Sequence, residues 1–329
     1  MMDSATRHAN VMRIAITGAS GFIGGRFLDA AKRDGVAGRS VAVLALTSSE
    51  DSARRVLAKH PDAKAVPLPG LDHGKLVEAM RECEALMHAS WSTVPAEAER
   101  DPLKDLHVNV ASSIRLFQAA IAAGVKRIVF ISSGGTVYGE PRWSPITEDH
   151  PLLPLSAYGT SKLCAEHYLL SLARAAGIEA LVLRPANVYG RGRSHDKPQG
   201  VVEHWLERLR AGQELLSWND TSVVRDYIHV DDVTAALIAS LHRPITEPFV
   251  NVGTGIGTSL KELAALMQRM TGIEARLSAS SSPYPALSRN VLSPALMERC
   301  LGVAPQVSLA DGIARTWTSM AAPGANRSL

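Results

Sequence analysis

Three glycines at intervals of three lie between a short apolar run and a helical pattern near the start of the chain. The run Arg13-Ile-Ala-Ile-Thr17 leads into Gly18, Gly21 and Gly24, and residues 22–33 then space their apolar side chains as a helix does. Such glycines permit a tight turn, a close approach of backbone to a pyrophosphate, and close packing of helix on strand. The sequence therefore predicts a strand, a phosphate-binding turn and a helix with its N-terminus at the phosphates.

Further apolar runs repeat this unit along the chain. They occur at 40–46, 63–67, 85–88, 127–131 and 180–183, and helix-like segments separate them. The last two are almost continuously apolar, which is typical of strands buried on both faces. We therefore predict an α/β fold, a doubly wound parallel sheet of the Rossmann type, with a smaller C-terminal substrate-binding lobe.

The alternation loosens after residue 187, and Gly190 to Pro198 is rich in Gly, Arg, Ser and Pro. We predict that residues 1–187 and 225–252 form an NAD(P)-binding domain, with 225–252 returning to the main sheet. Residues 188–224 and 253–329 are then expected to form the smaller lobe.

Composition excludes several partners. The chain of 329 residues carries a formal charge of +3 without long runs of one sign, so neither nucleic acid nor an anionic membrane is expected as partner. The three cysteines, Cys83, Cys164 and Cys300, lack metal-like spacing, and no metal is expected. Residues 1–10 lack the apolar core of a secretory signal, and no apolar stretch is long enough to span a membrane. We expect a cytoplasmic protein.

Tyr158 and Lys162 are four residues apart in a segment expected to be helical. Side chains at this spacing share a helix face, so the lysine ammonium can lie beside the phenol and favour its phenolate. By itself the pair equally fits a solvated lysine early in an amphipathic helix. The glycine turn upstream favours the interpretation of Tyr158 as an acid/base.

The order of motifs from about residue 12 to 315 resembles the extended short-chain dehydrogenase/reductase superfamily, in particular its nucleotide-sugar epimerase/dehydratase family. The matching motifs are the turn 17–24, His88-Ala-Ser90, Asn109-Val, Gly124-Val-Lys-Arg, Ser132-Ser-Gly-Gly-Thr-Val-Tyr-Gly139, Tyr158 with Lys162, Arg184-Pro-Ala-Asn-Val-Tyr-Gly190 and Arg225-Asp-Tyr-Ile-His-Val-Asp-Asp232.

The resemblance implies residue roles. Tyr158 would be the acid/base, Lys162 would bind the nicotinamide ribose, and Asn109 would support the site or only cap and pack. The cofactor contacts that it implies are Gly18, Gly21, Phe22, Ile23, Gly24, Thr47, Ala89, Ser90, Trp91, Tyr158, Lys162 and Pro185.

The chain departs from the family at the hydroxyl partner of the tyrosine. Gly134 stands where related epimerases carry Ser or Thr, and a glycine cannot donate a hydrogen bond from a side chain. We expect Thr136, rather than Ser133, to replace it. Gly135 and Thr136 stand where related dehydratases carry Asp and Glu, which argues against elimination of water.

For the substrate, the resemblance implies diphosphate contacts at Asn187 and Arg225 and a base-stacking aromatic at Trp218. A guanidinium suits a diphosphate because its planar fork binds oxygens in pairs. Trp218 could instead be a half-buried packing residue. Arg289 is the candidate for a second phosphate arginine, although its register matches the family poorly.

The cofactor is expected to be NAD, with NADP possible. The second strand ends at Thr47-Ser-Ser49 without the acidic residue that usually holds the ribose 2′-hydroxyl. Arg54 and Arg55 follow and could accommodate a 2′-phosphate, or could lie on a solvated helix face.

From this resemblance we expect an NAD-dependent nucleotide-sugar 4-epimerase that acts on a UDP-hexose or UDP-N-acetylhexosamine. The alternative is an NADPH-dependent reductase of a keto-sugar nucleotide or another carbonyl compound, and a non-catalytic redox-sensing or scaffold protein is a third interpretation. From relatives we expect a homodimer that pairs the helices at 106–123 and 156–176.

Overall fold

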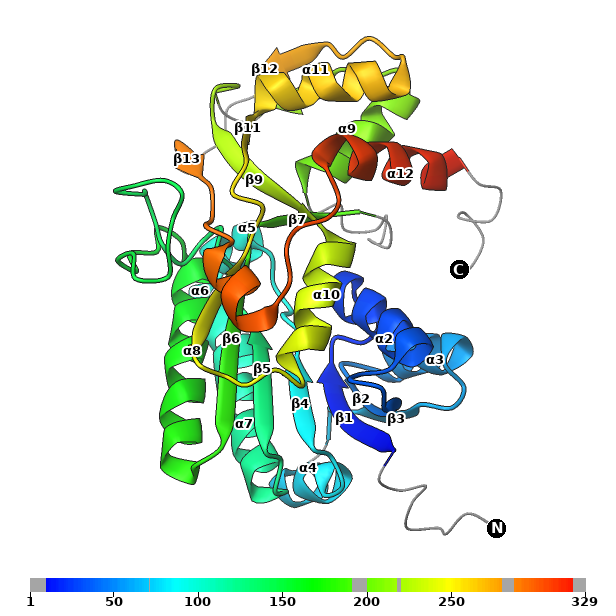
Figure 1. The fold of residues 1–329 in the computed structure, drawn as a ribbon, viewed down its shortest axis with the longest axis vertical. Coiled ribbons are helices and arrows are strands. Elements are labelled where there is room, and N and C mark those ends of the chain that lie inside the picture. Colours follow the sequence, from blue (N-terminus) through cyan, green and yellow to red (C-terminus); the bar gives the residue numbers. More distant parts are fainter. Residues whose placement is uncertain (1–9, 71, 191–199, 218–219, 280–286, 322–329) are drawn as a thin grey trace.

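Seven parallel strands form the central sheet in this computed structural model, which describes residues 10–70, 72–190, 200–217, 220–279 and 287–321. The strand order is β10-β6-β5-β4-β1-β2-β3, so the order reverses at β1 (Figure 1). The predicted doubly wound parallel sheet is confirmed. The strands are β1 (Val11–Thr17), β2 (Ser40–Thr47), β3 (Lys64–Pro67), β4 (Ala85–His88), β5 (Arg127–Ile131), β6 (Glu179–Pro185) and β10 (Phe249–Val252).

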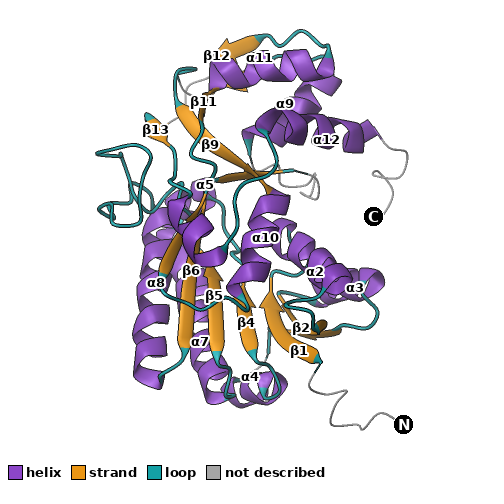
Figure 2. Cartoon of the chain, viewed as in Figure 1, coloured by secondary structure: helices purple, strands orange, loops and turns teal. Residues whose placement is uncertain are grey.

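Helices cover both faces of this sheet (Figure 2). One apolar core lies between the sheet and α2 (Phe22–Asp34), α3 (Glu50–Lys59), α10 (Val230–Ser240) and the short π-helix η2 (Met297–Leu301). A second core lies beneath α4 (His73–Met80), α7 (Ser112–Ala122) and α8 (Ala157–Ala176). Before α7 the chain forms α5 (Pro95–Arg100), α6 (Pro102–Asp105) and the π-helix η1 (Leu106–Ala111), so the helix predicted at 106–123 begins with a widened turn.

Local sequence explains the ends of the long helix α8. Ser156 precedes it in extended conformation, and its side chain accepts a hydrogen bond from Gly159 N. Gly177 ends the helix with φ of 64°, in the left-handed region that glycine occupies without strain. The helix therefore presents Tyr158 and Lys162 in its first two turns.

A smaller lobe stands above the carboxyl ends of the strands (Figure 1). Its strands are β7 (Asn187–Tyr189), β8 (Leu215–Ser217), β9 (Val224–His229), β11 (Gly257–Ser259), β12 (Leu277–Ala279) and β13 (Arg289–Asn290), and its helices are α9 (Val201–Arg210), α11 (Leu260–Thr271) and α12 (Leu309–Ala321). Its own core includes Trp205, Leu263 and Met267.

The segment 225–252 divides between the two sheets. Strand β10 pairs with β6 at the edge of the main sheet, as predicted. Strand β9 instead pairs with β7, β11 and β13 in the smaller sheet, so the predicted return of the whole segment to the main sheet is wrong for β9. The boundaries of the two domains stay a prediction.

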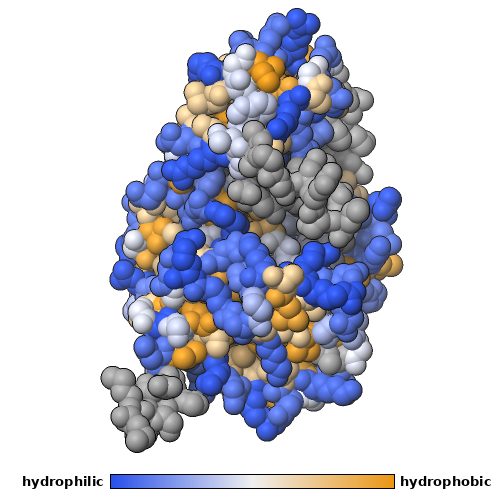
Figure 3. Space-filling view, turned by 90° about the vertical axis from the view of Figure 1, so that its right-hand side faces the viewer, coloured by the Kyte–Doolittle hydropathy of each residue, from blue (hydrophilic) through white to orange (hydrophobic). Residues whose placement is uncertain are grey.

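One face of the molecule is shown in Figure 3, where hydrophilic side chains predominate and apolar ones form small separate groups. Within the described residues, no helix combines the length and apolar character needed to cross a bilayer.

A buried ion pair ties α8 to the sheet. Arg184 on β6 and Glu166 on α8 are both fully buried, and Arg184 Nη2 donates to Glu166 Oε2 over 2.6 Å. Burial opposes the charge on Arg184, but the hydrogen bonds and the charge of Glu166 outweigh it and raise the pKa of the guanidinium. Arg184 Nη1 also donates to Tyr138 Oη over 3.0 Å, and Tyr138 Oη donates to Asn251 Oδ1 on β10 over 2.7 Å.

We expect Arg184→Met to lower the free energy of unfolding by about 3–5 kcal/mol, because it leaves the Glu166 carboxylate buried and unpaired. The double variant Glu166→Leu with Arg184→Met should recover most of this loss, since both charges are then gone. Urea unfolding followed by circular dichroism measures both. The control is Arg276→Met, which removes an exposed ion pair with Glu274 and should leave stability unchanged. A double variant no more stable than the single one would contradict this account.

Candidate active site

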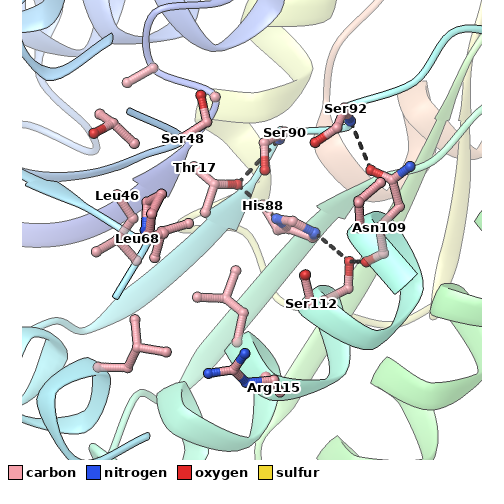
Figure 4. A pocket seen from close by; sticks show the side chains of 18 of the residues that line it. Thr17, Leu46, Ser48, Leu68, His88, Ser90, Ser92, Asn109, Ser112 and Arg115 are labelled. Atoms are coloured by element: carbon pink, nitrogen blue, oxygen red, sulfur yellow. Dashed lines mark hydrogen bonds between the residues drawn. The ribbon is translucent and has the colours of Figure 1, made fainter. Parts of the chain in front are cut away.

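A cavity of about 370 Å³ opens at the carboxyl ends of the central strands. It lies where the strand order reverses, which is where ligands bind in open α/β sheets. Figure 4 shows Thr17, Ser48, Ser90 and Ser92 around it, with Arg115 at its lower end. We call this the first cavity. The residues that line it are Thr17, Gly18, Ala19, Ser20, Leu46, Thr47, Ser48, Leu68, Pro69, Gly70, Leu76, His88, Ser90, Ser92, Val108, Asn109, Ser112, Ser113, Arg115 and Leu116.

The glycine turn is compact enough to require glycine. Gly18 has φ of 74°, and a Cβ there would lie 2.9 Å from the backbone of Ala89 and Ser90. A Cβ on Gly24 would lie 2.3 Å from Gly18 O. Helix α2 follows with no acidic residue in its first turn and no capping side chain, so its N-terminal amides fit an anion such as a pyrophosphate. The residues present therefore fit a dinucleotide.

His88 joins the turn to the helices behind it. Its Nδ1 lies 2.7 Å from Thr17 Oγ1, and its Nε2 lies 2.9 Å from Ser113 Oγ. Because Thr17 Oγ1 accepts the Ala89 and Ser90 amides, it donates to Nδ1, and the ring proton sits on Nε2. Burial lowers the pKa of His88 to about 3, so the ring is a neutral link. The family motif includes His88, but the sequence predicts no role for it.

The far end of the first cavity is formed by the end of β2. Thr47 is buried there, and its Oγ1 donates to Ser49 O over 3.2 Å. Arg54 is exposed and pairs with Asp51, while Arg55 donates to Ser52 Oγ over 3.0 Å. Neither arginine lines the cavity, which agrees with the solvated-face interpretation of the pair.

Tyr158 and Lys162 share one face of α8, as the spacing predicts. Lys162 is 4% exposed, and its Nζ donates to Ile131 O over 2.8 Å. Burial lowers the pKa of Lys162 to about 7, although the negative charges of Glu166 and Asp105 oppose the shift. The Tyr158 ring packs edge-on against the Trp91 indole, with centroids 6.2 Å apart.

Asn109 lies in η1, where its amide is used within the protein. Its Oδ1 accepts the Ser92 amide over 2.7 Å, and its Nδ2 donates to Thr93 Oγ1 and Asp105 Oδ1 at 2.9 Å each. Asn109 therefore holds the segment after β4 in place. The fully buried Asp105, absent from the sequence prediction, is the acceptor behind it.

A second cavity of about 230 Å³ adjoins the start of α8 and is lined by Pro95, Ala96, Glu99, Gly135, Thr136, Gly139, Leu155, Ser156, Arg225 and Leu287. Of the two hydroxyl candidates, Thr136 lines it and Ser133 does not. A Cβ on Gly134 would lie 2.4 Å from Leu292 Cδ1 and 2.9 Å from Arg184 O, so a side chain there would meet packed residues. Thr136 is accordingly the candidate that the structure places at a cavity.

The predicted substrate residues separate in the structure. Arg225 lines the second cavity and donates Nη1 to Val224 O over 2.8 Å. Asn187 donates Nδ2 to Asp226 O over 3.1 Å, and the exposed Arg289 donates Nε to Ser144 Oγ over 3.0 Å; neither lines the second cavity. Trp218 lies outside the described residues.

Pro185 and Glu99 also accept backbone hydrogen bonds near the site. Pro185 ends β6, and its carbonyl accepts the Gly134 amide over 2.9 Å. Glu99 lines the second cavity and accepts the Ala157 amide at the start of α8 over 2.5 Å. The sequence predicts no role for this residue. Nothing in its local sequence distinguishes it from a surface glutamate, since only the fold brings α5 to α8.

Comparison with known proteins agrees with this geometry. Residues 14–253 match the model of the "NAD dependent epimerase/dehydratase family". The chain is 35% identical over 307 residues to a UDP-glucose 4-epimerase of Mycolicibacterium smegmatis, which covers 93% of this chain and 97% of that protein.

Solved structures give the same result. The UDP-glucose 4-epimerase of Thermotoga maritima with UDP-glucose superimposes with a TM-score of 0.84 at 29% identity, covering 94% of this chain and 98% of that one. The UDP-glucose 4-epimerase of Thermus thermophilus in complex with NAD gives a TM-score of 0.81 at 30% identity, covering 93% and 98%. The chain therefore belongs to the NAD dependent epimerase/dehydratase family, enzymes of the extended short-chain dehydrogenase/reductase type.

Proposed function

We propose that this protein is an NAD-dependent nucleotide-sugar 4-epimerase, with a UDP-hexose or UDP-N-acetylhexosamine as substrate. The observation that supports the proposal is that sequence neighbours of Tyr158 and of its ring partner Trp91 line the two cavities. Tyr158 follows Ser156 of the second cavity by two residues, and its ring contacts Trp91, whose neighbours Ser90 and Ser92 line the first. Relatives named UDP-glucose 4-epimerase support the same choice.

Different residues of the chain have different roles in the proposed reaction. Bound NAD supplies the acceptance and return of a hydride at the sugar 4-position. Tyr158 takes the proton of the sugar 4-hydroxyl and later gives it back. The Lys162 ammonium on the same helix face stabilises the phenolate. We assign to Thr136, which lines the second cavity, a hydrogen bond to the sugar.

Arg225 is the residue we assign to the diphosphate. Burial of its guanidinium lowers its pKa, although Tyr227 and Glu140 oppose the shift, and its Nη1 donates to the Val224 carbonyl. A diphosphate in this cavity would give the guanidinium a further negative partner. Asn187, Trp218 and Arg289 remain proposed substrate contacts from resemblance alone.

The cofactor expected in the first cavity is NAD. Thr47 and Ser48 line the end next to β2, and Arg115, which comes from α7, is the charged side chain among the described residues that line it. The NADPH-dependent reductase alternative rests on the missing acidic residue at the end of β2, with Arg54 and Arg55 as candidates for a 2′-phosphate, and both arginines lie outside this cavity. The match to an NAD dependent family and the structural relative solved in complex with NAD support NAD as the cofactor.

We also propose a homodimer. Leu103 and Leu106 are 71% and 45% exposed, and they lie at the start of the helical segment for which the family resemblance implies pairing. Burying them against a second copy would remove this apolar surface from water. Sedimentation equilibrium is expected to give twice the chain mass.

Tyr158→Phe is expected to lower kcat for 4-epimerisation by about 10²–10⁴-fold, because it removes the acid/base group. The reaction is measured by incubating the protein, without added reductant, with UDP-glucose, UDP-galactose and the corresponding UDP-N-acetylhexosamines. The products are then separated by chromatography. The matched control is Tyr168→Phe, an exposed tyrosine on the same helix, which should keep the parent rate. Unchanged turnover in Tyr158→Phe, or no 4-epimer from any sugar, would refute the proposal.

Gly18→Ala is expected to abolish retention of NAD, because the new Cβ would collide with the Ala89 and Ser90 backbone. The nucleotide released by heating gel-filtered protein is identified by mass spectrometry and should be NAD in the parent. Gly74→Ala, where the Cβ would make ordinary contact at 3.5 Å, is the control and should retain it. Release of NADP from the parent would instead support the reductase alternative.

A further inference from the structure

Aromatic rings surround the ammonium group of Lys162. Its Nζ lies 3.9 Å from the centroid of the Trp91 ring, 4.9 Å from that of Phe130 and 5.9 Å from that of Tyr158. An ammonium has three N–H donors, and the hydrogen bond to Ile131 O uses one. The ring faces therefore take the place of water around much of this buried charge.

Few charged groups face this ammonium. Glu166 on α8 and Asp105 on α6 favour its charged form, while burial disfavours it. His88 on β4 is neutral, and Tyr158 is the remaining titratable neighbour. Because burial lowers the pKa of Lys162 to about 7, one additional contact with the ammonium has a measurable effect on its protonation near neutral pH.

The loop after β4 holds the Trp91 indole rigidly against Lys162. The amide of the next residue, Ser92, donates to Asn109 Oδ1, and the ring also packs on Phe130 with centroids 6.0 Å apart. The indole Nε1 is buried without a hydrogen-bond partner among the described residues. The polar edge of the indole thus makes no hydrogen bond within the described residues, whereas its face contacts the Lys162 ammonium.

We propose that Trp91 is a positioning residue for Lys162. The indole face of Trp91 keeps the Lys162 ammonium charged and holds it beside the Tyr158 ring. This rests on the proposed function in one respect, namely that Lys162 acts with Tyr158. An indole is the aromatic ring that attracts a cation most strongly, and the attraction is greatest where both groups are desolvated. Leucine would fill much of the same space without an aromatic face.

The direction of the effect follows from the charges. Trp91→Leu removes an attraction for the ammonium, so the pKa of Lys162 falls further and less of it is protonated at neutral pH. A less charged lysine stabilises the phenolate less, so the pKa of Tyr158 rises. The acidic limb of the profile of kcat/KM against pH then moves to higher pH.

The test titrates Lys162 directly in the NAD-containing enzyme. Trace acetylation with acetic anhydride is carried out from pH 5 to 10, and the Lys162 peptide is quantified by mass spectrometry. The pH midpoint of labelling is read, because access of the reagent changes its rate and leaves the midpoint in place. Trp91→Leu should lower the midpoint by about one pH unit, which is about a tenfold smaller ratio of charged to neutral lysine.

Trp91→Phe keeps an aromatic face and should give a midpoint between the parent and Trp91→Leu. Trp143→Leu removes a partly exposed tryptophan on a surface loop and should match the parent. Thermal unfolding shows whether each variant is folded, and Trp91→Phe serves if Trp91→Leu is not. An unchanged midpoint in the folded Trp91 variants would overturn the proposal. Because labelling needs no turnover, it distinguishes this failure from an absence of epimerase activity.

Discussion

The ion pair between Glu166 and Arg184 is the contact on which the geometry of the site depends. It lies one helical turn beyond Lys162, so it fixes both the rotation of α8 and the height of Tyr158 above the sheet. Two charges buried without solvent are stable only while each has its partner, so loss of either one would destabilise the packing of α8 on the sheet. The Tyr138 and Asn251 hydrogen bonds extend the same restraint to β10.

Charge is balanced locally in this interior. The positive charges of Lys162 and Arg184 are matched by Glu166 and Asp105, all four buried. His88 completes the region without adding charge, because desolvation keeps its ring neutral.

Features that depend on neighbours in sequence could be predicted, and features that depend on distant segments could not. The glycine turn, the strands of the main sheet and the placement of Tyr158 with Lys162 follow from local spacing and were correct. The sheet chosen by β9 depends on its pairing with β7 and β11, which a single sequence does not reveal. The contacts of Glu99 and Asp105 likewise form only when folding brings α5 and α6 against α8 and η1.

The two cavities draw on very different lengths of chain. Every residue around the first comes from positions 17–116, whereas the second combines positions from 95 to 287. The lining of the first cavity thus comes from one contiguous third of the chain, and that of the second from segments far apart in sequence. Under the proposed function, substitutions confined to the later segments of the second cavity would alter the choice of sugar and leave the lining of the first cavity unchanged.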